Sequence, residues 1–194
     1  QQVWRVPRDE LPSWGTPTIC ETARGPLLIA NATNFVRGYD ARTGKLRWKL
    51  ARNALITVPT PIVGHGLIFV TSGYRPIQPI YAIKLNAVGD ISLDEEQNSN
   101  NHIVWSKARG GPYLPTPILY GIFFYTCGND GIFTCYEART GKLIYRKRCG
   151  SGAATSFTAS PVAADGKIYV TAESGVVTAI KAGPEFEILS RHPI

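Results

Sequence analysis

A run of acidic residues between positions 90 and 96 has the clearest capacity in this sequence to bind a metal ion. Asp90, Asp94, Glu95 and Glu96 carry the oxygen ligands that Ca²⁺ prefers. Their spacing lacks the D-x-D-x-D-G order that places oxygens around an ion in an EF-hand loop. We therefore predict no metal site there.

Histidine and glycine motifs give no catalytic signature either. His65, His102 and His192 are scattered along the chain, and no H-E-x-x-H pair, Ser-His-Asp arrangement, G-x-S-x-G sequence or P-loop occurs. Strand-like sequence flanks Gly73, Gly128 and Gly131, which we interpret as hairpin turns. No catalytic residue is predicted, although a site assembled from distant parts of the chain would leave no local motif.

The four cysteines, at positions 20, 127, 135 and 149, form no C-x-x-C motif and no adjacent pair, so zinc and thioredoxin-like sites are not supported. A hairpin turn centred on residues 129–130 would place Cys127 opposite Ile132 and Cys135 opposite Phe124. The two sulfurs would then be about 10 Å apart, too far for a disulfide. We expect buried free thiols, and a longer-range link from Cys20 or Cys149 stays open.

The elements that would position any site are repetitive. ARTGKL occurs at 41–46 and again at 138–143, and an aromatic residue, Trp48 or Tyr145, follows at the same distance. Thr or Ser also precedes Pro four times, at Thr16, Thr60, Thr116 and Ser160. Repeats of about 40 to 50 residues that each hold several strands are typical of β-propeller blades.

Each repeat contains four strand-like segments separated by turns. In the last one, residues 160–163, 167–172, 176–182 and 186–192 read as strands, with Asp165-Gly166 and Ser174-Gly175 as tight turns. The 19 Gly and 14 Pro of the chain also favour short strands over helices. We predict an all-β propeller with four four-stranded antiparallel blades, at about 13–50, 56–108, 112–149 and 156–192.

The second repeat is longer than the others. A polar, acidic stretch, residues 86–102, replaces its third-to-fourth turn. Insertions of this composition in repeat proteins lie in surface loops, so we expect either mobile decoration or a binding loop.

The start of the chain resembles the end of a repeat. Trp4 precedes Pro17 by the same 13 residues that separate Trp48 from Pro61, so residues 1–12 are expected to be the last strand of a preceding blade and a linker. The chain begins with Gln and contains no Met, and it has no signal-like segment and no apolar run of about 18 residues. We expect a part of a seven- or eight-bladed ring, completed by missing blades or by a second chain.

The net charge of +7 raises the question of an anionic partner. The basic residues gather in the repeated turns and in the strands that follow them, where charge is normally solvated, so nucleic acid is not expected as a partner. These residues are Arg42, Lys45, Arg47, Lys49, Arg139, Lys142, Arg146, Lys147 and Arg148.

The repeated turn resembles the A-x-D-x-x-T-G-K-x-x-W repeat of the pyrroloquinoline-quinone (PQQ)-like β-propeller superfamily, which includes quinoprotein dehydrogenases and BamB-like outer-membrane assembly lipoproteins. Asp40, Thr43, Gly44, Lys45 and Trp48 match this pattern, with a Gly in place of its Ala; the third repeat keeps T-G-K but has Cys, Glu and Tyr for the Ala, Asp and Trp. The stretch ASPVAADGKIYVT most resembles uncharacterised secreted bacterial members.

The resemblance implies structural roles for the aromatic and glycine positions of the repeat. In such proteins the Trp packs between neighbouring blades and is approached by the Gly-containing turn. It therefore implies blade-docking roles here for Trp4, Trp48, Trp105, Tyr145, Gly44 and Gly141.

The resemblance also implies where a ligand would bind. In this superfamily the loops that join successive blades and the turns between second and third strands gather at one mouth of the central channel. Loop packing is the alternative role for the aromatic and Arg side chains in these loops. The candidate ligand-binding residues are Trp14, Arg52, Tyr74, Arg75, Arg109, Tyr113 and Phe157.

Enzymes of this superfamily bind PQQ with Ca²⁺ and usually carry two adjacent cysteines and a Trp beneath the cofactor. No adjacent cysteines occur here, so no cofactor is predicted. We expect a non-catalytic binding or scaffold propeller with an unknown protein or small-molecule ligand, secreted or periplasmic by resemblance. The alternative is a fragment of a PQQ-dependent dehydrogenase.

Overall fold

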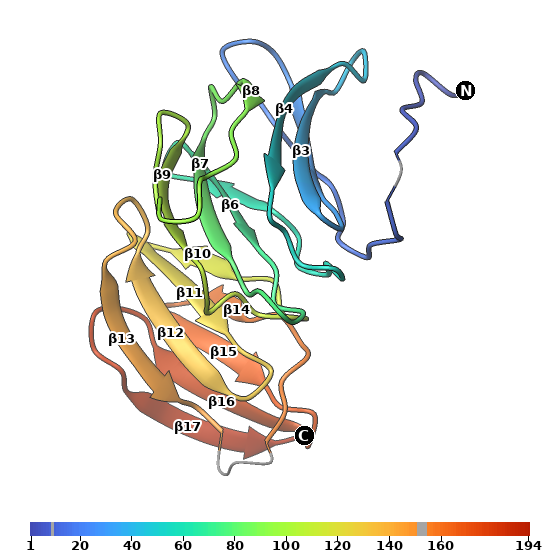
Figure 1. Cartoon of the computed structure of the whole chain (residues 1–194). Coiled ribbons are helices and arrows are strands. Elements are labelled where there is room, and N and C mark those ends of the chain that lie inside the picture. Colours follow the sequence, from blue (N-terminus) through green and yellow to red (C-terminus); the bar gives the residue numbers. More distant parts are fainter. Residues whose placement is uncertain (9, 151–154) are drawn as a thin grey trace.

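The computed structural model describes residues 1–8, 10–150 and 155–194, and all regular structure in these ranges is β-strand. The all-β class predicted from the sequence is confirmed. Four antiparallel sheets follow one another along the chain, each built mainly from consecutive strands, and we call them blades 1 to 4 (Figure 1). None of the described residues belongs to a helix able to cross a membrane.

The blades consist of the following strands. Blade 1 contains β1 (Thr18–Cys20), β2 (Leu27–Asn31), β3 (Phe35–Asp40) and β4 (Leu46–Ala51). Blade 2 contains β5 (Ile62–Gly64), β6 (Leu67–Thr71), β7 (Ile80–Lys84) and β9 (Ile103–Lys107). Blade 3 contains β10 (Ile118–Tyr120), β11 (Phe123–Cys127), β12 (Ile132–Glu137) and β13 (Leu143–Arg148). Blade 4 contains β14 (Val162–Ala164), β15 (Lys167–Thr171), β16 (Val176–Lys181) and β17 (Ile188–Pro193).

The four blades repeat the same register between their third and fourth strands. Gly38 lies opposite Trp48 in blade 1, Ala82 opposite Trp105 in blade 2, and Cys135 opposite Tyr145 in blade 3, and in every blade the register shifts directly after this pair. A bulge of this kind bends and twists the outer strand. The same local distortion therefore sets the same blade shape four times.

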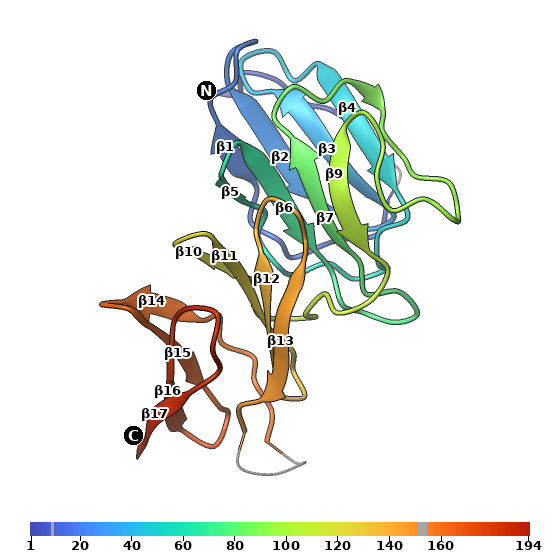
Figure 2. The same ribbon diagram turned by 90° about the vertical axis from the view of Figure 1, so that its left-hand side faces the viewer.

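The Thr/Ser-Pro sequence that marks each repeat joins successive blades at their first strands. The Thr60 N–H donates to the Thr116 hydroxyl (3.0 Å), and the Thr116 N–H donates to the Ser160 hydroxyl (2.9 Å). The first strand β10 accordingly contacts both β5 and β14. A hydroxyl is needed at these positions because it satisfies a backbone donor of the preceding blade. Figure 2 shows the resulting succession from blades 1 and 2 to blade 4.

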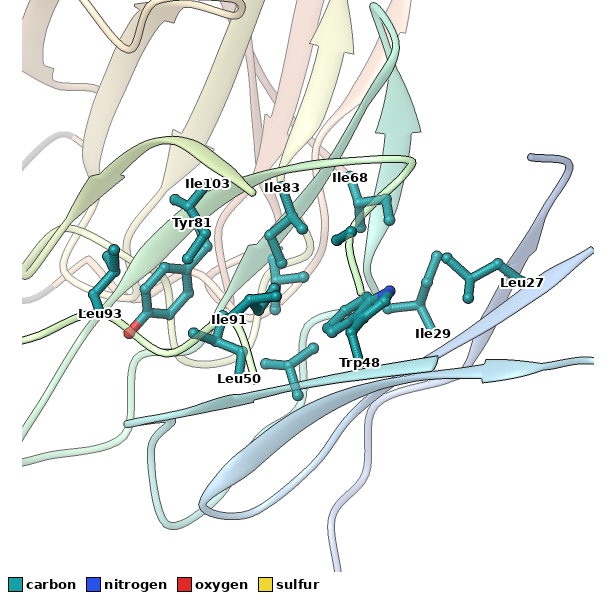
Figure 3. Close-up of a cluster of buried hydrophobic side chains, with 13 residues drawn as sticks. Leu27, Ile29, Trp48, Leu50, Ile68, Tyr81, Ile83, Ile91, Leu93 and Ile103 are labelled. Carbon is teal, nitrogen blue, oxygen red and sulfur yellow. The ribbon is translucent and has the colours of Figure 1, made fainter. Parts of the chain in front are cut away.

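Apolar side chains fill the spaces between neighbouring blades. Between blades 1 and 2, the Trp48 ring lies among aliphatic side chains of both blades, including Ile29, Ile68 and Ile83 (Figure 3). A second cluster joins blades 2 and 3 around Trp105 and Phe124, and a third joins blades 3 and 4 around Tyr145 and Phe133. Burial between blades, more than within them, stabilises this fold.

The insertion of blade 2 is more ordered than a surface loop. Residues Gly89–Asp90 form β8, which pairs in parallel with β4 as a fifth strand of blade 1. Ile91 is fully buried and Leu93 is 9% exposed, both in the cluster around Trp48. The prediction of a surface loop, either mobile decoration or a binding loop, is therefore wrong for part of the segment. This part covers the edge and core of blade 1, because its apolar residues pack into the hydrophobic cluster around Trp48.

The N-terminal segment differs from the expected strand. Residues 1–8 form no strand, since a strand requires ladder hydrogen bonds to a neighbour and no described strand pairs with them. The segment runs beside blade 1 (Figure 1) and is attached through the Trp4 side chain, whose Nε1 donates to the Ala41 carbonyl (2.9 Å).

The cysteine register is also corrected. Cys127 lies opposite Phe133, and Cys135 opposite Tyr125, one residue away from the predicted pairs. The turn is wider than expected because the Gly128 N–H donates to the Ile132 carbonyl and Gly131 adopts a φ of 75°. All four cysteines are free thiols. Burial is the largest effect and raises the pKa of Cys135 to about 12, although hydrogen bonds with Tyr125 and Tyr145 lower it.

Candidate functional site

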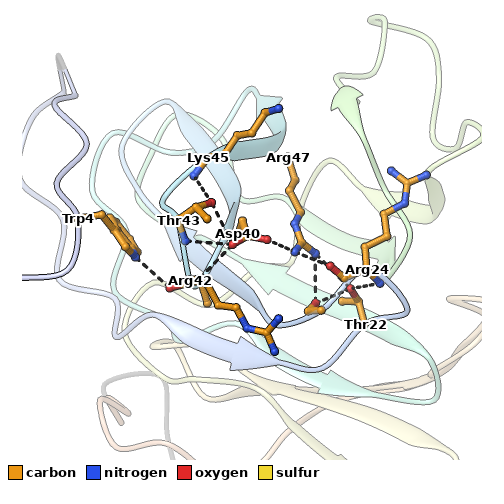
Figure 4. A network of polar contacts seen from close by, with 10 residues as sticks. Trp4, Thr22, Arg24, Asp40, Arg42, Thr43, Lys45 and Arg47 are labelled. Atoms are coloured by element: carbon orange, nitrogen blue, oxygen red, sulfur yellow. Dashed lines mark hydrogen bonds and ion pairs between the residues drawn. The ribbon is translucent and has the colours of Figure 1, made fainter.

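The ARTGK turn of blade 1 is organised by one carboxylate. Asp40 accepts hydrogen bonds from the backbone N–H groups of Arg42 (3.1 Å) and Thr43 (3.0 Å) and pairs with the Arg47 guanidinium (Figure 4). The Arg47 side chain is only 13% exposed, so this charge is not solvated as the sequence suggested. In blade 3, Glu137 accepts the equivalent bonds from the backbones of Arg139 and Thr140.

Two indole rings lie on the glycines of these turns in the same way. Trp4 donates to Ala41 O and Trp105 donates to Ala138 O, both at 2.9 Å. A Cβ on Gly44 would lie 2.8 Å from the Trp4 ring, and one on Gly141 only 2.4 Å from the Trp105 ring. Both glycines also have positive φ. Glycine is required for two reasons, the turn conformation and the approach of the indole.

Trp48 and Tyr145 occupy the same register position but have different contacts. The blade that follows Trp48 has lost its ARTGK turn, and the Trp48 Nε1, although buried, has no partner. The ring instead lies on Gly38 of its own blade, where a Cβ would be 2.2 Å away. Tyr145 packs edge-on against Phe186 of blade 4, with ring centroids 5.5 Å apart.

The Asp40 interactions predict an acid sensitivity. The hydrogen bond from Arg47 is the largest of several effects that lower the pKa of Asp40 to about 2. A group whose pKa is lower in the folded state stabilises it above the unfolded value, near 4, and this stabilisation is lost as the pH falls towards 2. Asp40→Asn should therefore unfold more readily than the wild type above about pH 5, as measured by urea titration. The difference should shrink to nearly nothing at pH 2, and a constant difference over this range would contradict the assignment.

The loops of blades 2, 3 and 4 line an open cavity of about 910 Å³. Tyr74 and Tyr113 face one another on its wall, with ring centroids 5.2 Å apart and an angle of 52° between the ring planes. Tyr74 is 38% exposed, and Arg75 beside it is exposed as well. The charged side chains at the cavity are Arg75, Arg146, Asp130 and Glu173. A pair of accessible aromatic rings next to an arginine is suited to binding a partner group.

The structure brings together three of the seven candidate ligand-binding residues: Tyr74, Arg75 and Tyr113. Trp14 is 63% exposed but lies at blade 1, where its backbone N–H donates to Thr57 O. Arg52 pairs with Glu95 of the insertion at 2.9 Å. Arg109 is exposed outside the cavity lining, and Phe157 is buried against Gly131, so its role is loop packing.

Sequence reasoning missed a buried polar network between blades 1 and 2. The Asn53 amide donates to Asn31 Oδ1 (2.7 Å) and to Ala32 O (2.8 Å), and Asn53 Oδ1 accepts from the Ser72 hydroxyl. The Asn31 amide donates to Pro59 O and Thr71 O. Asparagine in a loop normally indicates a turn, and nothing local distinguishes these two from the exposed ones.

The residues described here do not fit a PQQ and Ca²⁺ site. No three His, Cys, Asp or Glu side chains of the described ranges come together to hold a metal ion. The acidic side chains of the insertion are partly committed to cations, Asp90 to Lys49 (3.1 Å) and Glu95 to Arg52. The cavity itself is lined by two arginines and by two carboxylates from different blades, Asp130 and Glu173, and the described residues bring no third carboxylate, His or Cys to them.

Comparisons with known proteins agree on the fold. Residues 102–183 match the family described as "Outer membrane protein assembly factor BamB". A comparison with curated protein sequences gives no match. Among solved structures, BamB from Moraxella catarrhalis is 17% identical with a TM-score of 0.62, over 91% of this chain and 50% of that one.

Two dehydrogenases are also similar in structure. The quinohemoprotein alcohol dehydrogenase ADHIIG from Pseudomonas putida HK5 is 14% identical with a TM-score of 0.67, over 98% of this chain and 35% of that one. Quinohemoprotein alcohol dehydrogenase from Comamonas testosteroni is 19% identical with a TM-score of 0.52, over 70% and 21%. The chain thus spans half or less of the length of these proteins.

The family match falls on the end of blade 2, blade 3 and most of blade 4, and the structural matches extend the same fold over nearly the whole chain. The repeated Trp, T-G-K and bulge positions described above recur within it. This chain has the β-propeller fold, and its residues 102–183 match the BamB family of PQQ-like repeats.

Proposed function

We propose that this chain is a non-catalytic binding or scaffold propeller that holds a segment of a partner protein at the cavity between blades 2, 3 and 4, in a secreted or periplasmic setting. The observation that carries the proposal is the Tyr74–Tyr113 pair on the wall of the cavity. Tyrosine and arginine are enriched among the residues that dominate binding energy at protein interfaces, and both are present here in accessible positions.

The backbone around this pair supports the same proposal. Gly111 and Gly73 pack backbone to backbone: a Cβ on Gly73 would lie 2.4 Å from the backbone of Pro112 and Tyr113. The Gly111 N–H donates to Gln78 O (2.8 Å), and the Gln78 side chain donates to Gly73 O (3.2 Å). Tyr74 and Tyr113 are therefore presented on two loops that hold each other, and a pre-organised site loses less entropy on binding.

The second candidate, part of a PQQ-dependent dehydrogenase, has the likeness to the two quinohemoprotein dehydrogenases in its favour. That likeness, below 20% identity, concerns the fold, which enzymes and scaffolds share. The residues of this chain do not support the dehydrogenase candidate, because the described ones do not fit a PQQ and Ca²⁺ site.

Site-specific photo-crosslinking tests the proposal. A photoreactive phenylalanine analogue in place of Tyr113 should yield a discrete protein adduct when the protein is expressed in a bacterial periplasm, whereas the same analogue in place of Trp14 should not. Tyr74→Ala should reduce the adduct formed at position 113 about tenfold, as loss of a dominant interface side chain would.

Equal yields of adduct from positions 113 and 14 would contradict specific binding at the cavity. Binding of PQQ with Ca²⁺, seen as cofactor absorbance that remains after gel filtration and supports dye-linked oxidation of an alcohol, would replace this proposal with the dehydrogenase alternative.

A further inference from the structure

The outer edge of blade 1 is covered by an acidic strand from the same chain. β8 runs parallel to β4, with Trp48 opposite Gly89 and Lys49 opposite Asp90. The Ile91 N–H donates to Lys49 O (2.9 Å), and the Ala51 N–H donates to the Ser92 hydroxyl (2.9 Å). Lys49 and Asp90 also form an ion pair (3.1 Å). Backbone pairing and charge together hold the covering strand.

The outer strand of blade 3, β13, corresponds to β4 position by position. β13 follows the second ARTGK, so Tyr145 stands where Trp48 does and Arg146 where Lys49 does. The pairing with the inner neighbour is the same as well: Thr134 lies opposite Arg146 just as Arg37 lies opposite Lys49, and both ladders shift after the next pair. With an identical register, the backbone groups of β13 that point outward are those that β4 presents to β8.

No strand in the described ranges covers this second edge. The sheet of blade 3 ends at β13. In blade 2 the long connection 85–102 supplies β8, but the corresponding connection of blade 4, residues 182–187, is short and forms no strand. Its contacts with blade 3, from Gly183 and Phe186, are to Tyr125, Cys135, Phe133 and Tyr145 and not to the outer edge of β13. An uncovered edge strand is a template for another chain.

The charge of this edge defines the partner. Arg146, Lys147 and Arg148 are exposed, and residues 138–164 contain no Asp or Glu. The outer strand of blade 4, β17, is a poorer template than β13, because it ends at Pro193, which lacks an N–H donor. The segment that covers β4 is correspondingly acidic, since residues 87–96 contain Asp90, Asp94, Glu95 and Glu96.

We infer that β13 is a docking edge for an acidic, extended protein segment, which adds in parallel as a fifth strand of blade 3 with a carboxylate opposite Arg146. This surface differs from the Tyr74–Tyr113 wall of the cavity proposed above, although Arg146 also lines that cavity, and it recognises its partner through backbone pairing plus one specific ion pair. β-strand addition of this kind draws its affinity from main-chain hydrogen bonds and its specificity from side chains at alternate positions.

A synthetic peptide with the sequence of residues 87–96, AVGDISLDEE, is the probe, since it has the side chains that cover β4. Fluorescence anisotropy should show binding of the labelled peptide to the whole chain, and hydrogen exchange should show new protection of the backbone amides in β13. Arg146→Glu should weaken binding roughly tenfold, as expected when a cross-strand ion pair becomes a repulsion. Lys142→Glu, with the same change in net charge just before the strand, should change it less than twofold.

Two further comparisons separate strand addition from simple charge attraction. A peptide methylated on the Ile91 nitrogen keeps its charge but loses one ladder hydrogen bond, and it should bind at least fivefold more weakly, in keeping with the loss of about 1 kcal/mol. Tyr74→Ala should leave peptide binding unchanged, so failure of the cavity proposal is distinguishable from failure of this one.

The inference is overturned if the methylated peptide binds as well as the unmodified one, or if Arg146→Glu and Lys142→Glu have equal effects. It is also overturned if the peptide does not bind, including the case in which Arg146→Glu reduces binding to phosphatidylglycerol vesicles instead, because the basic edge would then be a lipid-binding surface.

Discussion

Trp105→Ala is expected to lower the free energy of unfolding by about 3–5 kcal/mol, the range found when large buried aromatic residues are truncated. The Trp105 ring is 5% exposed, lies on Gly141 and contacts Phe69 and Phe124, so its removal leaves a cavity between blades 2 and 3. It also leaves Ala138 O without its indole donor. Urea unfolding followed by tyrosine and tryptophan fluorescence measures the change.

Trp14→Ala is the matched control, because Trp14 is 63% exposed and the same atoms are removed. It should alter the free energy of unfolding by less than about 0.5 kcal/mol, as substitutions of exposed residues usually do. Similar losses in the two variants would mean that Trp105 does not join the blades in the way the structure indicates.

The repeated features of this fold were predictable because each leaves a local signal in every copy. The Thr/Ser-Pro pairs, the T-G turns and the alternating strands recur in several repeats. A strand or turn that is ambiguous in one repeat can therefore be assigned from the others. Gly141 shows why: its turn conformation follows from the residue type alone, and the indole on it follows from the position of Trp105 in the preceding repeat.

Features that occur once were not predictable. β8 pairs with a strand some 40 residues earlier, and a stretch rich in Asp, Asn and Glu gives no strand signal. Its few apolar residues, Ala87, Val88, Ile91 and Leu93, do not form a recognisable strand pattern. The predicted register of β11 against β12 was wrong by one residue, because the Gly128–Gly131 turn is compatible with either Ile132 or Phe133 opposite Cys127. The hydrogen bond from Gly128 N–H to Ile132 O selects Phe133.

The candidate site was predictable only in part, because its residues lie in connecting loops, whose sequences do not repeat from blade to blade. Tyr74 and Tyr113 were named with Trp14 and Phe157 on the same grounds, their place in connecting loops. Burial divides them: Phe157 is 1% exposed, and Trp14 lies open at another blade. Which aromatic side chain turns inward depends on neighbours such as Gly131, whose missing Cβ makes room for the Phe157 ring.

Asn53→Ala is expected to cost about 3 kcal/mol of the free energy of unfolding, an effect comparable to loss of core packing although only a side-chain amide is removed. Asn53 is 5% exposed, and its amide is the single group that contacts Asn31, Ala32 and Ser72 at once. Without it three buried polar groups lose partners, and each such loss costs roughly 1–3 kcal/mol when water cannot enter. Thermal and urea unfolding measure the effect, with the exposed Asn101→Ala as control.

Asn53→Asp sharpens the test, because it keeps the size and shape of the side chain. The carboxylate can still accept from Ser72, but it places oxygen against Asn31 Oδ1 and Ala32 O, where the amide had donated. This variant should therefore be less stable than Asn53→Ala at pH 7 and should recover towards it at pH 4, since protonation removes the buried charge and restores one donor. If Asn53→Asp matches the wild type at pH 7, the network does not hold blades 1 and 2 together, and their association rests on the Trp48 cluster alone.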